Sequence, residues 1–249
     1  ILPPLGDNAA WIEWTHRSVA ALIGILVLAV AFVAVRRERA RRSVVGASLL
    51  AVVLVGAQAW IGRITVETNN AGEWVTAHLA MAMLVLALLA FIAVRARYPA
   101  GLPPRGASQR LTLLLSFSAA SVFALMLFGA HVTASGAALI FPDWPLFDGR
   151  LLPAFSDNPT LAALQLSHFL HRFVAAVVAV VVLVAALAAW RWARRGAPGG
   201  QALLGLVGTA AALYAIQVIV GALQIFTQLA AWAVALHLAL GAAIWALLA

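Results

Sequence analysis

The sequence lacks cysteine and lysine and carries little charge of either sign. Charged residues make up 10% of its 249 residues, and all sixteen basic residues are arginines. Without cysteine, the chain can form neither a disulfide nor a thiolate metal site. An ordinary globular domain carries about 25% charged residues, so this composition excludes a water-soluble domain.

Long apolar runs take the place of the missing charge. Hydrophobic residues make up 65% of the chain, and the mean hydropathy is +1.02. A helix needs about 20 apolar residues to cross roughly 30 Å of hydrocarbon. Seven runs of that length occur, near residues 11–35, 44–66, 74–94, 111–132, 161–190, 202–226 and 230–249. Lipid leaves unpaired backbone groups without partners, and no run alternates like a barrel strand, so the sequence predicts an all-α integral membrane protein.

The arginines gather in three short segments. The net charge is +8, and twelve of the arginines lie within residues 36–42, 95–110 and 191–195, while seven of the eight acids fall on or near the opposite side. The positive-inside rule places arginine-rich loops in the cytoplasm. We therefore expect a multi-pass protein of the cell (inner or plasma) membrane, with Ile1 outside and Ala249 in the cytoplasm. The arginines are interpreted as topology signals and not as a nucleic-acid surface.

Two pairs of histidines recur inside the apolar runs. His78 follows His16 by 62 residues, and His237 follows His171 by 66 residues. The second histidine of each pair is the last residue of a three-residue pattern with identical spacing. The pattern is Gln58, Gly62 and His78 in the first copy, and Gln217, Gly221 and His237 in the second. Ionisable residues within spanning helices tend to mark function. We interpret the pairs as duplicated cofactor sites in the outer half of the membrane.

The chemistry of paired imidazoles favours haem. Neutral imidazole binds iron and copper well, and helix bundles build cofactor sites from side chains that face each other across the core. Two histidines from different helices suit a six-coordinate haem, whereas a mononuclear non-haem metal normally needs a further ligand such as a carboxylate. Since there is no Cys-x-x-Cys-His motif, the haem would not be covalently attached. His131 has no partner in the repeat and is interpreted as a packing residue.

The repeat extends to the loops. Leu2-Pro3-Pro4 resembles Leu152-Pro153-Ala154 at an offset of 150, and the second copy has four apolar runs where the first has three. We expect two parallel four-helix repeats, related by an axis along the membrane normal, that form an eight-helix bundle. Seven of these helices are present in this chain, and the first is expected upstream of Ile1. The predicted units are an N-terminal repeat (1–98), a cytoplasmic linker (99–110) and a C-terminal repeat (111–249).

Together these elements resemble the haem A synthase family. The resemblance spans essentially the whole chain and rests on the order of five elements: Glu13-x-x-His16-Arg17, the segment from Gly62 to His78, the loop 136–149 with Pro142-Asp143-Trp144-Pro145, the pair His171-Arg172, and the segment from Gln217 to His237. One departure is that many relatives have a cysteine pair in an outer loop, whereas the second-copy loop has none.

The resemblance implies an oxidoreductase that oxidises the C8 methyl of haem O to the formyl of haem A for terminal oxidase assembly. It implies that His171 and His237 ligate a haem b, that His16 and His78 ligate haem O or haem A, and that Glu13 is the catalytic carboxylate. Arg17 and Arg172 are candidates for binding haem propionates, which pair well with guanidinium groups. Haem O synthase and oxidase assembly factors are implied partners. Whether the protein forms a homo-oligomer is left open by the sequence.

The residues by themselves support a difference between the two copies. Glu13 and His16 are three residues apart and share a helix face, whereas the second copy has His168 in place of Glu13. A positioned general base is typically worth about 10² to 10⁴ in rate, so the first copy suits oxidation and the second electron transfer. Alternatively, Glu13 only pairs with Arg17 on the surface. A di-haem b cytochrome and a secondary transporter that uses its histidines for protons are the competing functions.

Overall fold

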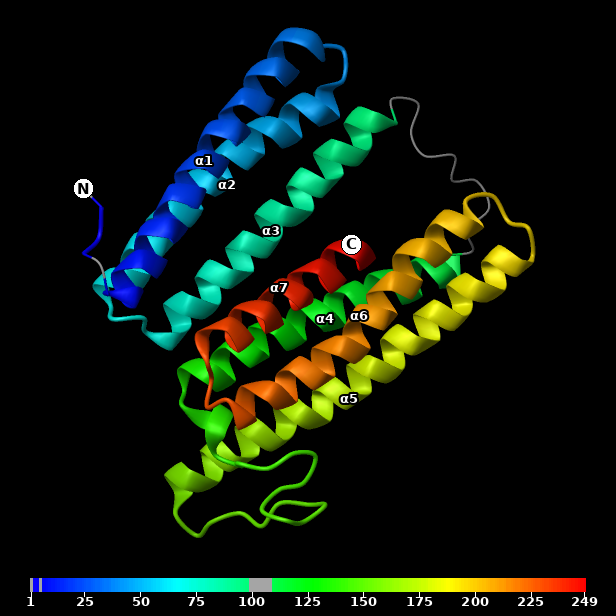
Figure 1. Ribbon diagram of the computed structural model, residues 1–249. Coiled ribbons are helices and arrows are strands. Elements are labelled where there is room, and N and C mark those ends of the chain that lie inside the picture. Colours follow the sequence, from blue (N-terminus) through cyan, green and yellow to red (C-terminus); the bar gives the residue numbers. More distant parts are fainter. Residues whose placement is uncertain (1, 5, 99–108) are drawn as a thin grey trace.

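The computed structural model describes residues 2–4, 6–98 and 109–249, and this part of the chain forms seven long helices (Figure 1). The helices are α1 (Asn8–Arg37), α2 (Arg42–Glu67), α3 (Gly72–Arg97), α4 (Gln109–Ala134), α5 (Pro159–Arg194), α6 (Gly200–Phe226) and α7 (Ala231–Leu248), with a short 3₁₀ helix, η1 (Ala137–Leu139). All seven are long and apolar enough to cross a membrane. The prediction of an all-α, multi-pass membrane protein is confirmed.

The helices end where polar residues can satisfy their termini. Helices α1, α3 and α5 finish with arginines in the last turn, where a positive charge complements the helix dipole. At the opposite end of the bundle, Asp7 accepts a hydrogen bond from the N–H of Ala10, and Asn158 caps α5 ahead of Pro159, as helix starts prefer. The arginine-bearing C-terminal ends of α1, α3 and α5 therefore point toward the same end of the molecule (Figure 1).

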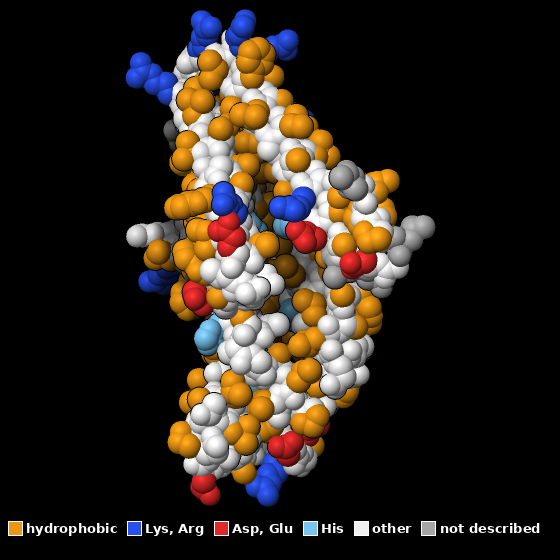
Figure 2. All heavy atoms as spheres, turned by 90° about the vertical axis from the view of Figure 1, so that its left-hand side faces the viewer, with side chains coloured by type: hydrophobic (Ala, Val, Ile, Leu, Met, Phe, Trp, Pro, Cys, Tyr) orange, Lys and Arg blue, Asp and Glu red, His pale blue; other side chains and the backbone are white. Residues whose placement is uncertain are grey.

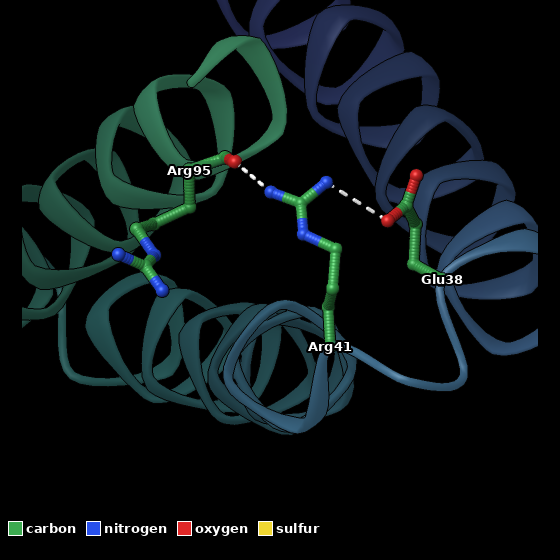
Figure 3. A network of polar contacts seen from close by, with 3 residues as sticks. All are labelled: Glu38, Arg41 and Arg95. Carbon is green, nitrogen blue, oxygen red and sulfur yellow. Dashed lines mark hydrogen bonds and ion pairs between the residues drawn. The ribbon is translucent and has the colours of Figure 1, made fainter. Parts of the chain in front are cut away.

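The short connection between α1 and α2 is tied to α3 (Figure 3). Arg41 donates from Nη1 to Oε2 of Glu38 at 2.8 Å, and from Nη2 to the main-chain carbonyl of Arg95. One guanidinium thus joins the ends of all three helices in the N-terminal half. The predicted linker 99–110 lies mostly outside the described residues, but α4 already begins at Gln109, so the last two residues of that linker are helical.

The helices form two groups of unequal packing. Helices α4 to α7 form a bundle in which α4 packs on α5, α5 on α6, α6 on α7 and α7 on α4 (Figure 1). Helix α3 lies against α4 and α7. Helix α1 packs on α2, and α2 packs on α3. The larger apolar core is in the first group and includes Val182, Val207 and Ile244. The smaller core joins α1, α2 and α3 through residues such as Val27 and Ala51. Much of the apolar surface of α1 is exposed.

Two turns in the two halves have the same backbone. The connection between α2 and α3 and the connection between α6 and α7 each contain two consecutive left-handed residues: Asn69 (φ 53°) and Asn70 (φ 60°), and Gln228 (φ 53°) and Leu229 (φ 59°). The offset between them is 159 residues, as for the two glutamines of the sequence pattern. A left-handed leucine is disfavoured by its own sterics, so the turn reflects the packing of the helix pair. This match supports the repeat that the sequence predicts.

The loop between α4 and α5 folds into a compact structure at the acid-rich end. The main chains of Phe147 and Arg150 exchange two hydrogen bonds, and Asp143 accepts from the N–H groups of Asp148 and Gly149 at 2.9 and 2.8 Å. The hydrogen bond from Gly149 is the main reason that the pKa of Asp143 lies below its usual value. Phe141 and Phe147 are buried beneath this turn. The loop therefore lies over the helices in a defined conformation.

Candidate functional site

The first histidine pair comes together between α1 and α3. The ring centroids of His16 and His78 lie 6.4 Å apart, with 60° between the ring planes. A bond between a metal and an imidazole nitrogen is about 2 Å long, and the ring centre lies about 1 Å beyond it, so two axial imidazoles place their centroids about 6 Å apart. The separation of this pair therefore suits two ligands on opposite sides of one haem iron.

The second pair lies between α5 and α7, at the same ends of the helices. His171 and His237 are close enough to interact electrostatically. Nδ1 is buried in both rings, as it is in His78, and in none of these three does it have a hydrogen-bond partner in the described part of the chain. Buried polar atoms are nearly always hydrogen-bonded in proteins. The described residues thus leave one nitrogen of each of these rings without a hydrogen-bond partner.

Three of the histidine rings rest on glycines of a neighbouring helix. A Cβ built on Gly62 of α2 would lie 2.8 Å from Cε1 of His78, one on Gly129 of α4 would lie 3.0 Å from Cε1 of His171, and one on Gly221 of α6 would lie 3.2 Å from Cε1 of His237. An added Cβ at Gly62 would force the His78 ring to shift, and one at Gly129 or Gly221 would require the facing ring to give by a few tenths of an ångström. The sequence pattern contains Gly62 and Gly221, but sequence reasoning missed Gly129. Its signal is that it is the one glycine of α4.

The duplicated glutamines also contact the histidines, but differently in the two halves. Nε2 of Gln58 lies 3.2 Å from Nε2 of the His78 ring. Nε2 of Gln217 instead donates to the main-chain carbonyl of His237 at 2.8 Å. In both glutamines Oε1 is buried without a hydrogen-bond partner among the described residues. Sequence reasoning used these residues only as markers of the repeat.

Glu13 and Arg17 form an ion pair on the exposed side of α1. The distance from Nη1 to Oε1 is 3.0 Å, and the two side chains are 53% and 74% exposed, respectively. Surface pairing of Glu13, one of the two alternatives left by the sequence, is thus present. His16 is exposed as well, whereas His78 is half-buried. Figure 2 shows histidine side chains in a hollow of this face, with acidic and basic side chains beside it.

Arg172 joins α5 to the outer loop. Its Nε donates to Nε2 of the buried His168 at 3.0 Å, Nη1 donates to the carbonyl of Leu146 at 2.9 Å, and Nη2 donates to the carbonyl of Phe141 at 3.2 Å. The guanidinium also lies 4.9 Å from the centre of the Phe147 ring. Every nitrogen of this side chain has a protein partner, so a haem propionate would have to compete with the loop for Arg172.

Among the described residues, the remaining histidines and acids form no cluster that could hold a metal ion. His131 is exposed near the end of α4, and the described residues contain no group of three or more histidine and carboxylate side chains that could hold a metal ion. A mononuclear non-haem site would normally need such a group. The paired imidazoles therefore remain the candidate sites for iron.

A family model described as COX15-CtaA, cytochrome oxidase assembly protein, matches residues 7–249. Among similar proteins, one named heme A synthase from Parvibaculum lavamentivorans is 29% identical over 198 residues, which cover 73% of this chain and 54% of that protein. Proteins with the same name from Methylorubrum extorquens (strain PA1) and Sphingopyxis alaskensis are 30% and 31% identical, covering 91% and 92% of this chain and 61% and 65% of theirs. The chain thus spans less than two thirds of each relative's length. With a match that takes in all seven helices and both histidine pairs, the chain belongs to the COX15-CtaA family of cytochrome oxidase assembly proteins.

Proposed function

We propose that this protein is a haem A synthase, which oxidises the C8 methyl of haem O to the formyl of haem A for terminal oxidase assembly. The observation that carries the proposal is the separation of His16 and His78, which suits two axial ligands of one haem iron. The names of the similar proteins support the same activity. Haem O synthase and oxidase assembly factors are the proposed partners.

The N-terminal half is the proposed substrate site. His16 from α1 and His78 from α3 hold the haem substrate, and Gly62 lets the second ring lie close to α2. Glu13 lies one turn from His16 on α1, so its carboxylate is the group available to accept a proton as the methyl is oxidised. Arg17 holds this carboxylate at 3.0 Å and is the proposed partner of a haem propionate.

The C-terminal half is the proposed site of a resident haem b. His171 and His237 hold and orient it, and Gly129 and Gly221 give their rings room. When bound, a haem with two histidine ligands supplies one-electron redox chemistry. Arg172 fastens the outer loop across the end of α5, so the buried aromatic side chains of that loop exclude water from this half.

The packing of the two halves supports this division. A substrate must enter and its product must leave, and His16 is exposed. A resident cofactor needs neither route, and His171 and His237 lie on α5 and α7, which carry the larger core, with neither side chain exposed. We also propose that both sites face the outer side of the cell membrane, because the arginine-rich ends of the helices lie opposite them.

Pigment analysis of the full-length protein tests the proposal. The protein, supplied with haem O and a working electron acceptor, should form haem A, which extraction and mass spectrometry detect alongside haem b. Haem b alone, with no conversion of haem O, would identify a di-haem b cytochrome. The exposed Glu13–Arg17 ion pair is the observation that favours this second candidate. Absence of any pigment would contradict both and leave a transporter.

A further inference from the structure

The side chain of Gln58 contacts Nε2 of the His78 ring. A Cβ on Gly62 would lie 3.3 Å from Nδ1 of His78 and 3.7 Å from Nε2. Nδ1 is therefore the ring nitrogen nearer to α2, and it is buried. Nε2 lies farther from α2 and is the nitrogen assigned to iron here, and the Gln58 amide lies 3.2 Å from it.

We propose that the side-chain amide of Gln58 competes with haem iron for Nε2 of His78 and so sets how tightly the N-terminal site holds its haem. The inference rests on the proposed function, because it takes His78 as an axial ligand. A neutral imidazole nitrogen has a single lone pair in the ring plane. That lone pair either accepts a hydrogen bond from the amide or binds iron. If the amide is turned so that Oε1 faces the ring, Nε2 carries the proton and is equally occupied.

The second copy shows that the contact with the ring is not imposed by the repeat. Gln217 precedes Gly221 by four residues, as Gln58 precedes Gly62, yet its amide bonds the main chain of His237. A Cβ on Gly241 would lie 3.4 Å from Nε2 of Gln217, and the matching position in the first copy is Ala82. The first copy therefore has an additional methyl group at the position that leaves room for the amide in the second.

This difference fits the two proposed tasks. A site that must release its product benefits when the axial histidine has a competing hydrogen-bond partner. When the iron leaves, the ring nitrogen forms a hydrogen bond with that partner, which lowers the cost of release. A site that keeps its cofactor gains from a ring whose glutamine is bound elsewhere. Gln58 is thus a positioning residue for substrate exchange, and Gln217 anchors α7 to α6.

The test compares Gln58→Met with Gln217→Met in the full-length protein with haem b in its C-terminal site. Methionine keeps the length of the side chain and removes the amide. Haemin is titrated into the N-terminal site and followed by its Soret band, and its release is followed by transfer to a haem-scavenging protein. Loss of one competing hydrogen bond between neutral groups should tighten haemin binding about fivefold and slow its release in Gln58→Met. Gln217→Met should leave the N-terminal site unchanged.

Unchanged or weaker haemin binding in Gln58→Met would overturn the inference. If that variant fails to fold, Gln58→Asn, whose amide is too short to reach the ring, should show the same gain. His78→Ala separates this inference from the proposed function. If it abolishes N-terminal haemin binding while the Gln58 variants match the parent protein, only the role of Gln58 is wrong. If His78→Ala leaves binding unchanged, both the site and the role of Gln58 are wrong.

Discussion

The two histidine pairs share a sequence pattern and differ in their surroundings. In the N-terminal half, His16 is exposed, and Arg17 pairs with the exposed Glu13. In the C-terminal half, the corresponding arginine, Arg172, bonds the buried His168 and fastens a loop. The same four-residue spacing on a helix thus makes a surface ion pair in one copy and an internal clamp in the other. A duplicated motif preserves the position of its histidines, while packing decides how exposed each pair and its neighbouring arginine are.

Removing a C-terminal ligand should have the largest effect. In His171→Ala or His237→Ala, one axial bond to the iron is lost, so the low-spin, bis-imidazole b-type spectrum of the C-terminal haem should disappear. Absorption and electron paramagnetic resonance spectra of the purified variants measure this loss. His16→Ala is the matched control and should leave that spectrum in place. An unchanged spectrum in both C-terminal variants would show that these residues are not the ligands.

Glu13→Gln tests whether the difference between the halves is catalytic. The substitution keeps the shape of the side chain but removes its charge, so haem A formation should fall by about 10² to 10⁴, as measured by mass spectrometry of extracted haem. The C-terminal haem spectrum should stay unchanged. Arg17→Gln breaks the same ion pair without removing the acid, so a smaller loss in that variant than in Glu13→Gln would assign the effect to the carboxylate. Equal rates for Glu13→Gln and the parent protein would reduce Glu13 to a surface partner of Arg17.

The hydrogen bonds from Arg172 to the outer loop should make its substitution more destabilising than the substitution of Arg17. Arg172→Ala leaves the carbonyl groups of Phe141 and Leu146 without their donor, which should lower the free energy of unfolding by about 2 to 4 kcal/mol. Arg17→Ala breaks an exposed ion pair and should cost less than about 1 kcal/mol. Thermal unfolding in detergent and proteolysis of residues 136–150 compare the two. Similar stability of both variants would show that Arg172 does not hold the outer loop in place.

Substitution of the glycines that face the histidine rings (Gly62, Gly129 and Gly221) should have the smallest effects on haem affinity, and these effects should differ in size. A methyl group at Gly62, Gly129 or Gly221 would lie 2.8, 3.0 or 3.2 Å from the facing imidazole carbon, and overpacking of this kind costs about 1 to 3 kcal/mol. Haem affinity should therefore fall most in Gly62→Ala and least in Gly221→Ala, each at its own site. Gly46→Ala is the control, because an added Cβ there meets no atom within 4 Å. A reversed order would show that the rings yield to the methyl groups.

Much of the fold could be predicted because it follows from composition along the chain. Each of the seven predicted apolar runs corresponds to a helix, since a membrane-spanning segment must satisfy its own backbone hydrogen bonds. The spacing of Gln58, Gly62 and His78 likewise predicted their counterparts in the second half. Gly129 and the partners of Arg172 could not be predicted, because they depend on contacts between helices and a loop that are distant in sequence.

The sequence by itself therefore determined the membrane class, the helix boundaries to within a few residues, the arginine-rich end and the pairing of the histidines. These properties follow from hydropathy and from periodic spacing, which are local. Only the tertiary structure decided which nitrogen of His78 is engaged, which carbonyls Arg172 binds and how exposed each pair is. Those properties depend on close contacts between helices and a loop that are far apart in the sequence, and local hydropathy and spacing do not encode such contacts.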